Sequence, residues 1–204
     1  MKIWNNIPSD KVIETTKQSL QENGFLVTVV ENGQQAKEKI IQLLPKGAEV
    51  MDMTSVTLDT IGVSQIITQS GDYDAVKKKL AKMDRKTQSR EMQKIGAAPQ
   101  WAVGSVHAVT ENGEVIIASN TGSQLQAYIY GASYVVWVIG AQKIVKNIDD
   151  GMKRIYEYCL PLEAERAKKA YGAAGSNISK IAIVNKEINP KRITIILVRE
   201  KLGF

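Results

Sequence analysis

Six consecutive hydrophobic residues at positions 134–139 restrict the fold of this chain more than any other segment. A strand of this composition has no polar face, so both of its faces must be buried. Such strands occupy the centre of mostly parallel sheets that helices cover on both sides. Gly140 follows the run directly and is expected to end the strand. We therefore expect an α/β fold built on a buried parallel sheet.

The rest of the chain alternates between segments of strand and helix character. Consecutive β-branched and apolar residues predict strands, and apolar residues three or four apart predict helices. Residues 84–99 are polar and lack a clear period. The predicted strands are residues 25–30, 48–53, 102–110, 114–119, 180–184 and 193–198, and helices are predicted between Ser9 and Asn23, over 36–44, after 54–59, and over 73–83, 124–130 and 148–171, the last with a break near Pro161.

Asn112-Gly113 lies between the predicted strands 102–110 and 114–119. An Asn-Gly pair between apolar runs is the strongest short signal for a β-hairpin. The predicted fold class is therefore α/β, with a mostly parallel sheet, flanking helices and one β-hairpin. The length of 204 residues suits a single domain. Residues 1–45 either belong to that domain or form an N-terminal extension of helix and strand character.

The composition indicates in which compartment the chain is expected to function. Hydrophobic residues make up 44% and charged residues 24%, which is typical of a globular domain. No apolar run reaches membrane-spanning length, and the first residues lack the apolar core of a signal peptide. We therefore expect a cytoplasmic protein without a membrane span.

Cys159 and His107 are the single cysteine and the single histidine of the chain. One cysteine cannot form an internal disulfide, and an iron–sulfur cluster usually needs about four cysteine ligands. A zinc site made of Cys and His is excluded for the same reason. No residue spacing indicates another metal. The chain also lacks the GxGxxG fingerprint, so NAD and flavin are not assigned and the cofactor stays unknown.

The net charge of +6 comes from lysines spread along predicted helices, as at 75–82. The simplest interpretation is a solvated helix face. No RNA- or DNA-binding motif accompanies the charge, so nucleic-acid binding is not predicted. The charge also suits attraction of a small anionic metabolite or an acidic partner protein.

Three loops that follow predicted strands carry candidate ligand-binding residues. In parallel sheets, ligands usually bind at the carboxyl ends of strands, where hydroxyls, glycine and free amides can hold an anion. Ordinary helix capping explains several of these residues equally well, and Lys143 could simply be exposed. The candidates are Thr54 and Ser55 in the first loop, Asn120, Thr121, Gly122, Ser123 and Gln124 in the second, and Gly140 and Lys143 in the third.

His107 and Glu111 are the candidate catalytic residues. Residues four apart in a strand point to one face, so the two could form an acid–base pair, or Glu111 could act as a nucleophile. The structural alternative is that His107 is an ordinary core or surface residue and that Glu111 only flanks a turn. A tight hairpin would set Glu111 opposite Glu114, which is unfavourable for like charges and slightly favours a functional role.

Four motifs in order along the chain resemble those of LUD-domain proteins of the lactate-utilisation C type. They are residues 103–113 (VGSVHAVTENG), 118–125 (ASNTGSQL), 137–145 (WVIGAQKIV) and 157–167 (EYCLPLEAERA). The resemblance implies a fold similar to the sugar-phosphate isomerase and CoA-transferase superfamily. It also implies a role in oxidising L-lactate to pyruvate together with separate iron–sulfur proteins.

On this resemblance the chain is expected to be a non-redox component that binds a small anionic ligand at its strand–helix loops. The sequence leaves open whether it is an enzyme and whether it forms a homo-oligomer. A second resemblance joins Thr110–Gly113 to the Ser-Glu-Asn-Gly motif of class I CoA-transferases, in which the glutamate forms a thioester with CoA. The alternatives are therefore a CoA-transferase-like or isomerase-like enzyme that uses Glu111, and an assembly subunit without a small-molecule site.

Overall fold

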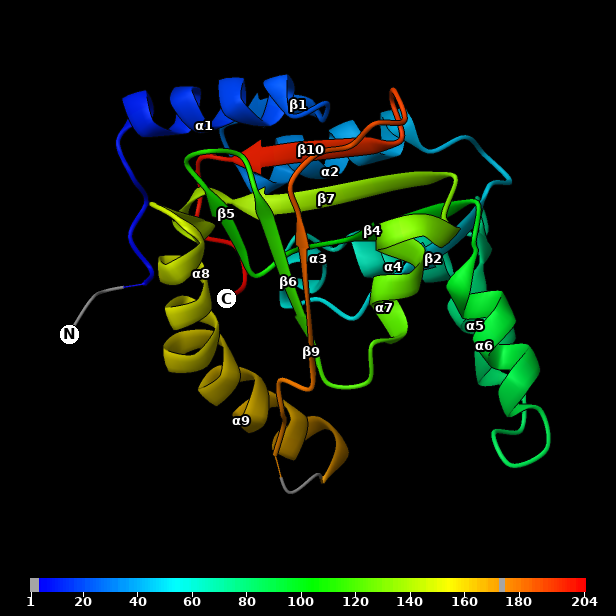
Figure 1. The fold of residues 1–204 in the computed structure, drawn as a ribbon. Helices are drawn as coiled ribbons and strands as arrows, with labels where there is room; N and C mark the ends of the chain where they lie inside the picture. The colour runs from blue at the N-terminus through cyan, green and yellow to red at the C-terminus, as the bar shows by residue number, and fades with distance from the viewer. Residues whose placement is uncertain (1–3, 173–174) are drawn as a thin grey trace.

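A six-stranded parallel sheet organises the chain in the computed structural model, which describes residues 4–172 and 175–204. Every neighbouring pair of its strands is parallel. Figure 1 shows the sheet crossing the molecule with helices on both sides. In spatial order the strands are β1 (Leu26–Val30), β10 (Ile193–Val198), β7 (Tyr134–Gly140), β4 (Trp101–Gly104), β2 (Glu49–Asp52) and β3 (Asp74–Ala75).

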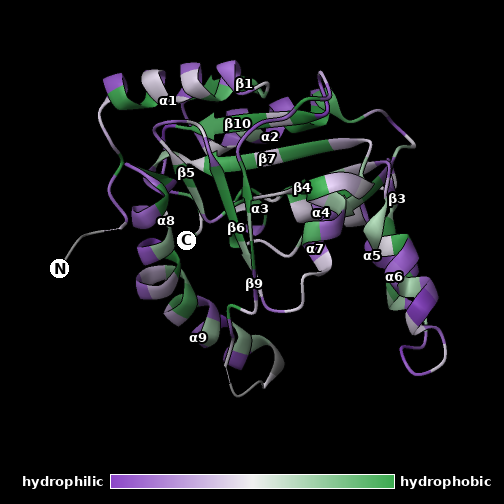
Figure 2. Cartoon of the chain, viewed as in Figure 1, coloured by the Kyte–Doolittle hydropathy of each residue, from purple (hydrophilic) through white to green (hydrophobic). Residues whose placement is uncertain are grey.

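Strand β7 lies between β10 and β4 and is buried on both faces, as its sequence predicts. Val135, Trp137 and Ile139 belong to one apolar cluster, and Val136 and Val138 belong to another. Alternate side chains of a strand point to opposite faces of its sheet, so the two clusters are the two sides of one layer. Figure 2 shows β7 and β10 as largely hydrophobic along their length.

Helices cover one face of the sheet. Ile40, Leu58 and Ile67 lie in the same cluster as Val136 and Val138, one from each of three helices. These helices follow β1 and β2, as parallel strand connections require. They are α2 (Gly33–Leu43), α3 (Val56–Thr60) and α4 (Val63–Gln69).

A second, four-stranded sheet and helix α1 (Asp10–Glu22) cover the other face. The predicted hairpin is confirmed: β5 and β6 are antiparallel, and β6 also pairs with β9 in antiparallel register. Val115 and Ile117 face the main sheet, whereas Ile116 and Ala118 face a third cluster beneath a long helix. The strand order is β8 (Ile144–Val145), β5 (Ala108–Thr110), β6 (Val115–Ser119) and β9 (Lys180–Val184).

The single strand predicted over 102–110 was wrong. Residues up to Gly104 pair with β7 in the main sheet, and residues from Ala108 pair with β6 in the second sheet. The chain crosses between the sheets at Ser105–His107, just after Gly104, where an added Cβ would come within 1.6 Å of the Tyr128 hydroxyl. Apolar residues continue through the crossing because both sheets are buried, so the pattern gave no sign of it.

The helices around residue 80 also differ from the prediction. Asp74–Ala75 pair with β2 as strand β3, so helix α5 covers only Val76–Ala81 rather than 73–83. Residues 84–99 contain helix α6 (Ser89–Ala97), which has no buried residue. Its apolar residues Met92, Ile95 and Ala97 are partly buried, so the helix has an apolar side, but its nine residues are fewer than the window of about 11–18 residues in which a helical period is recognised. Figure 1 shows α5 and α6 projecting together from one end of the sheet.

The long helix predicted over 148–171 continues through Pro161. It consists of α8 (Ile148–Arg154), a π-helical turn (Ile155–Cys159) and α9 (Leu160–Tyr171). Proline lacks the N–H that the helical ladder needs, and here it falls in the first turn of α9, directly after the π-helical turn. Over residues 4–172 and 175–204, no helix combines the length and the apolar character needed to cross a membrane.

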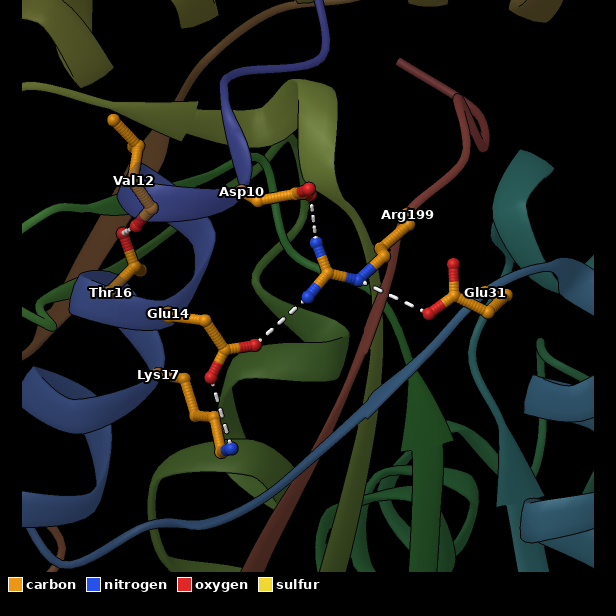
Figure 3. Close-up of polar contacts among 7 residues, drawn as sticks. All are labelled: Asp10, Val12, Glu14, Thr16, Lys17, Glu31 and Arg199. Atoms are coloured by element: carbon orange, nitrogen blue, oxygen red, sulfur yellow. Dashed lines mark hydrogen bonds and ion pairs between the residues drawn. The ribbon is translucent and has the colours of Figure 1, made fainter.

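The N-terminal residues contribute to the main sheet and its core. Strand β1 pairs with β10 along its whole length, and Ile13 and Leu20 of α1 share a cluster with Trp137. Arg199 follows β10 and binds Asp10 and Glu14 of α1 as well as Glu31 (Figure 3). The Arg199–Glu14 distance is 2.9 Å and the Arg199–Glu31 distance is 3.3 Å. Whether residues 1–45 fold as part of one domain stays a prediction.

Candidate functional site

A pocket of about 350 Å³ lies beside the carboxyl ends of β2, β4, β6 and β7. This is the edge at which open parallel sheets usually bind ligands. The wall opposite these strand ends comes from the π-helical turn and α9, and from the C-terminal Phe204, which is marked by the C between α8 and α3 in Figure 1. The polar or ionisable lining includes Thr54, Ser55, Thr57, Ser105, His107, Asn120, Thr121, Ser123, Gln124, Lys143, Cys159, Glu163 and Arg166.

Lys143 is buried at the wall of this pocket, with 2% of its surface exposed. It lies in a short 3₁₀ turn directly after β7. Its Nζ donates hydrogen bonds to Ser105 Oγ at 3.0 Å, to Thr57 Oγ1 at 3.1 Å and to the Val106 carbonyl at 3.2 Å. The sequence left room for an exposed lysine at this position, and the structure shows a buried one.

The surroundings of Lys143 disfavour its charged form. Burial and, to a lesser degree, the positive charge of Arg154 lower the pKa of Lys143 from 10.5 to about 7, while Cys159 acts in the opposite direction. Its three hydrogen-bond partners are all uncharged. An ammonium group in such a place is costly unless an anion joins it.

Arg154, from the end of α8, places a second buried cation behind the pocket. Its Nη1 donates to the His107 carbonyl and, at 2.9 Å, to Cys159 Sγ, while its Nε and Nη2 have no hydrogen-bond partner within residues 4–172 and 175–204. Burial lowers the pKa of Arg154 and raises the pKa of Cys159, which Arg154 partly offsets. Among the described residues, neither Arg154 nor Lys143 has a carboxylate within 4.0 Å.

His107 lies at the crossing between the two sheets and lines the same pocket. Its Nδ1 accepts a hydrogen bond from the Ala118 backbone N–H at 3.1 Å. Burial, followed by the charges of Lys143 and Arg154, lowers the pKa of His107 to about 3. The ring is therefore neutral at physiological pH, and because Nδ1 is an acceptor, Nε2 carries the proton. A ligand oxygen can accept a hydrogen bond from that Nε2–H.

The loop after β6 contributes four of its five predicted residues to the pocket lining, and these are Asn120, Thr121, Ser123 and Gln124. The loop is braced internally: Ser119 Oγ accepts from the Gly122 N–H at 2.9 Å, and Thr121 Oγ1 donates to Ser123 Oγ at 3.0 Å. Gly122 does not line the pocket. It adopts φ +85°, and an added Cβ would meet the side chain of Lys180 at 2.6 Å.

Thr54 and Ser55 also line the pocket, at the end of β2. Ser55 in addition caps helix α3 by accepting from the Leu58 N–H at 3.4 Å, so the capping explanation applies to it. Gly140 lies outside the pocket lining. An added Cβ there would approach the Leu202 backbone nitrogen to 2.7 Å, so glycine lets the C-terminal segment pack closely and brings Phe204 to the pocket.

Glu111 lies away from this pocket. It lines a smaller hollow together with Trp4 and Gln142, and its backbone N–H donates to the Val145 carbonyl at 2.9 Å. The argument that placed His107 and Glu111 on one strand face was wrong, because His107 precedes β5 and belongs to the crossing rather than to the strand. The two candidate catalytic residues therefore line different hollows.

The polar or ionisable residues of this site that sequence reasoning missed include Thr57, Ser105, Arg154, Cys159, Glu163 and Arg166. Thr57 and Ser105 follow strands β2 and β4, so the rule that selected Thr54 and Asn120–Gln124 could have found them once the crossing at Ser105 was known. Arg154 and Cys159 lie on a helix far along the chain, and only tertiary packing brings them here. Among the described residues, no cluster of three His, Cys, Asp or Glu side chains is arranged to hold a metal ion.

The fold and the pocket define an α/β protein with a basic site at the carboxyl ends of its parallel strands. A family model described as the LUD domain matches residues 13–198, and the chain therefore belongs to the LUD-domain family. The membership confirms the resemblance inferred from the four sequence motifs. At the level of the family it supports a role related to lactate utilisation.

A solved structure has a similar fold, a DUF162 family protein from Deinococcus radiodurans determined at 1.70 Å resolution. The TM-score is 0.58, the sequence identity is 11%, and the similarity covers 94% of this chain and 99% of that chain. At this identity the likeness concerns the fold alone. No curated protein matches the sequence.

Proposed function

We propose that this chain is the non-redox component of an L-lactate-oxidising system, and that its pocket binds a small carboxylate of that reaction. The observation that carries the proposal is the pair of buried cations, Lys143 and Arg154, to which the described residues bring no carboxylate. Buried charges are normally paired. A carboxylate ligand at Lys143 would supply the missing negative charge.

The other lining groups suit the same ligand. Thr54, Thr121 and Ser123 offer hydroxyls, and His107 offers a fixed neutral N–H donor. A volume of about 350 Å³ is at the small end of ligand sites, which typically measure about 300–1,000 Å³. A small, oxygen-rich anion fits this combination of size and donors.

The oxidation of lactate to pyruvate releases two electrons, which need an acceptor. Since the chain has a single cysteine, we propose that separate iron–sulfur proteins accept them and that this chain contributes ligand binding. Mixing the purified chain with the iron–sulfur proteins of the same lactate system tests this part by size-exclusion chromatography. Co-elution supports the proposal, and independent elution contradicts it.

The binding proposal is tested by thermal unfolding with L-lactate and pyruvate. Lactamide and pyruvamide serve as matched ligands, because they keep the shape but lack the carboxylate. A ligand at about one hundred times its Kd stabilises the folded state by about 2.7 kcal/mol. We expect both acids to raise the Tm and both amides to leave it unchanged.

Two variants make the test specific to the pocket. Lys143→Met removes the buried charge and should abolish the Tm shift, whereas Lys153→Met changes an exposed lysine on α8 and should leave the shift intact. Equal shifts for acids and amides, or a full shift in Lys143→Met, would refute carboxylate binding at this site. The absence of any shift would favour the assembly-subunit alternative.

A further inference from the structure

Lys143 has the surroundings of a reactive amine rather than those of a simple surface cation. Its Nζ lies at the wall of a pocket and contacts two hydroxyls and one carbonyl. An exposed lysine such as Lys153 is solvated and does not share this environment. Lysines that attack carbonyl groups need such desolvation, because only the neutral amine has a free electron pair.

The hydrogen-bond partners can accommodate Lys143 with or without its third proton. The Thr57 hydroxyl donates to the Leu202 carbonyl at 3.1 Å and therefore accepts from Lys143. The other acceptor near the Ser105 hydroxyl is the Val106 carbonyl at 3.5 Å, the outer limit of a hydrogen bond. Since a hydroxyl rotates freely, Ser105 can turn its proton toward the electron pair of a neutral amine.

Building on the proposed carboxylate site, we infer that Lys143 is a nucleophile that captures the carbonyl carbon of a 2-oxo acid as an imine. A 2-oxo acid is the oxidised counterpart of a 2-hydroxy acid such as lactate. The site would therefore distinguish the two oxidation states of its ligand by chemistry as well as by contact, since the hydroxy acid has no carbonyl to attack.

The reaction balances without an oxidant or a reductant. The Nζ electron pair forms the C–N bond, and a proton passes from nitrogen to the former carbonyl oxygen, which gives a carbinolamine. Loss of that hydroxyl with the remaining nitrogen proton, as one water molecule, forms the C=N bond. Addition of water reverses both steps and releases the 2-oxo acid. Ser105 is the nearby hydroxyl that can relay a proton to the oxygen during these steps, and the neutral His107 ring can donate a hydrogen bond to that oxygen.

The electrostatics agree with this assignment. Burial and the charge of Arg154 lower the pKa of Lys143 to about 7, so a substantial fraction of the amine is neutral at physiological pH. A lysine with its ordinary pKa near 10.4 is almost entirely protonated at that pH.

The test is reductive trapping of the full chain. The protein is incubated with pyruvate and sodium cyanoborohydride, and its intact mass is measured before peptide mapping. We expect a single adduct on Lys143, heavier than the protein by pyruvic acid minus one oxygen atom. L-lactate should give no adduct. The yield should rise as the pH increases through about 7, since the neutral amine is the reactive form.

Two variants serve as controls. Lys153→Met should keep the adduct, and Lys143→Met should lose it. Adducts spread over exposed lysines, or an undiminished adduct in Lys143→Met, would overturn the inference. A Tm shift with pyruvate but no adduct would overturn it while leaving the proposed carboxylate site intact, whereas the absence of both would refute the two proposals together.

Discussion

Two buried cationic regions of this protein differ in how their charge is compensated. Arg192 precedes β10, at the end of the sheet opposite to the strand ends that line the pocket, and Glu187 pairs with it at 2.9 Å. Its remaining nitrogens donate to the carbonyls of Ala127, Tyr128 and Ala132. Lys143 and Arg154 have no such carboxylate among the described residues, where two Arg154 nitrogens also lack a hydrogen-bond partner and the guanidinium lies 5.2 Å from the centre of the Tyr158 ring.

The contrast separates a structural cation from a cation suited to a ligand. Arg192 donates hydrogen bonds to carbonyls at the end of the π-helical turn Ala127–Gly131. Together with Glu187, these carbonyls compensate its charge within the protein. The pair at the pocket keeps positive charge that the protein leaves uncompensated. Substitutions at Glu187, Lys143, His107 and Glu111 test this difference between the two regions.

Glu187→Gln should destabilise the protein most. The change removes the negative charge beside Arg192, which is 7% exposed, and breaking a buried pair in this way costs about 3 kcal/mol or more. Urea unfolding measures the loss. Glu165→Gln is the matched control, because the Glu165–Lys169 pair is exposed to solvent and should contribute little to stability. Equal losses for both variants would contradict the structural role of Arg192.

Lys143→Met should have the opposite sign and raise the free energy of unfolding. Replacing an uncompensated buried charge by an apolar side chain of similar length should gain about 1–3 kcal/mol at or below pH 7. Because the pKa of Lys143 is lowered to about 7, the folded protein releases this proton at a lower pH than the unfolded chain does. The wild-type protein therefore gains stability between pH 7 and about 10, where the unfolded lysine still binds its proton.

The advantage of Lys143→Met should consequently shrink across that pH range. Urea unfolding of both proteins at several pH values gives the difference directly. A difference that stays constant from pH 6 to pH 10 would show that the lysine keeps its proton in the folded protein.

His107→Asn should alter the response of the protein to acid. The pKa of His107 is lowered to about 3, so between pH 6.5 and 3 the unfolded chain binds a proton that the folded protein does not. Wild-type stability should therefore fall through this residue as the pH is lowered over this range. Asn keeps an acceptor near the Nδ1 position but does not titrate, so the variant should lose less stability. Parallel acid-unfolding curves for the two proteins would contradict the assignment.

Glu111→Gln should leave carboxylate binding unchanged, because Glu111 lines the smaller hollow rather than the pocket. The Tm shifts with L-lactate and pyruvate should match those of the wild-type protein. The same variant tests the CoA-transferase alternative, since the nucleophile of such an enzyme cannot be replaced by an amide. Acyl-CoA transfer that disappears in Glu111→Gln would establish a role for this residue that is separate from the basic pocket.

The helices and strands were predicted best where a short sequence pattern directly reflects burial or a turn. The unbroken apolar run of β7 predicts a central strand, and Asn112-Gly113 predicts the hairpin; both are confirmed. Prediction failed at Ser105–His107, where the chain changes sheets while remaining buried, and at α6, which is short and whose apolar side is only partly buried. Local apolar patterns predict that a residue is buried, but they do not predict which of the two sheets it joins.

The residues of the candidate site fall into the same two groups, those that a local pattern predicts and those that it does not. The amino-acid sequence alone predicts the family, the position of the polar loops after β2 and β6, and the presence of Lys143 after β7, since each depends on residues close together in the chain. The burial of Lys143, the approach of Arg154 and Cys159, and the separate position of Glu111 follow only from the folded structure. The reason is physical: the energy of a charge depends on its solvent and its neighbours, and distant segments of the chain provide both.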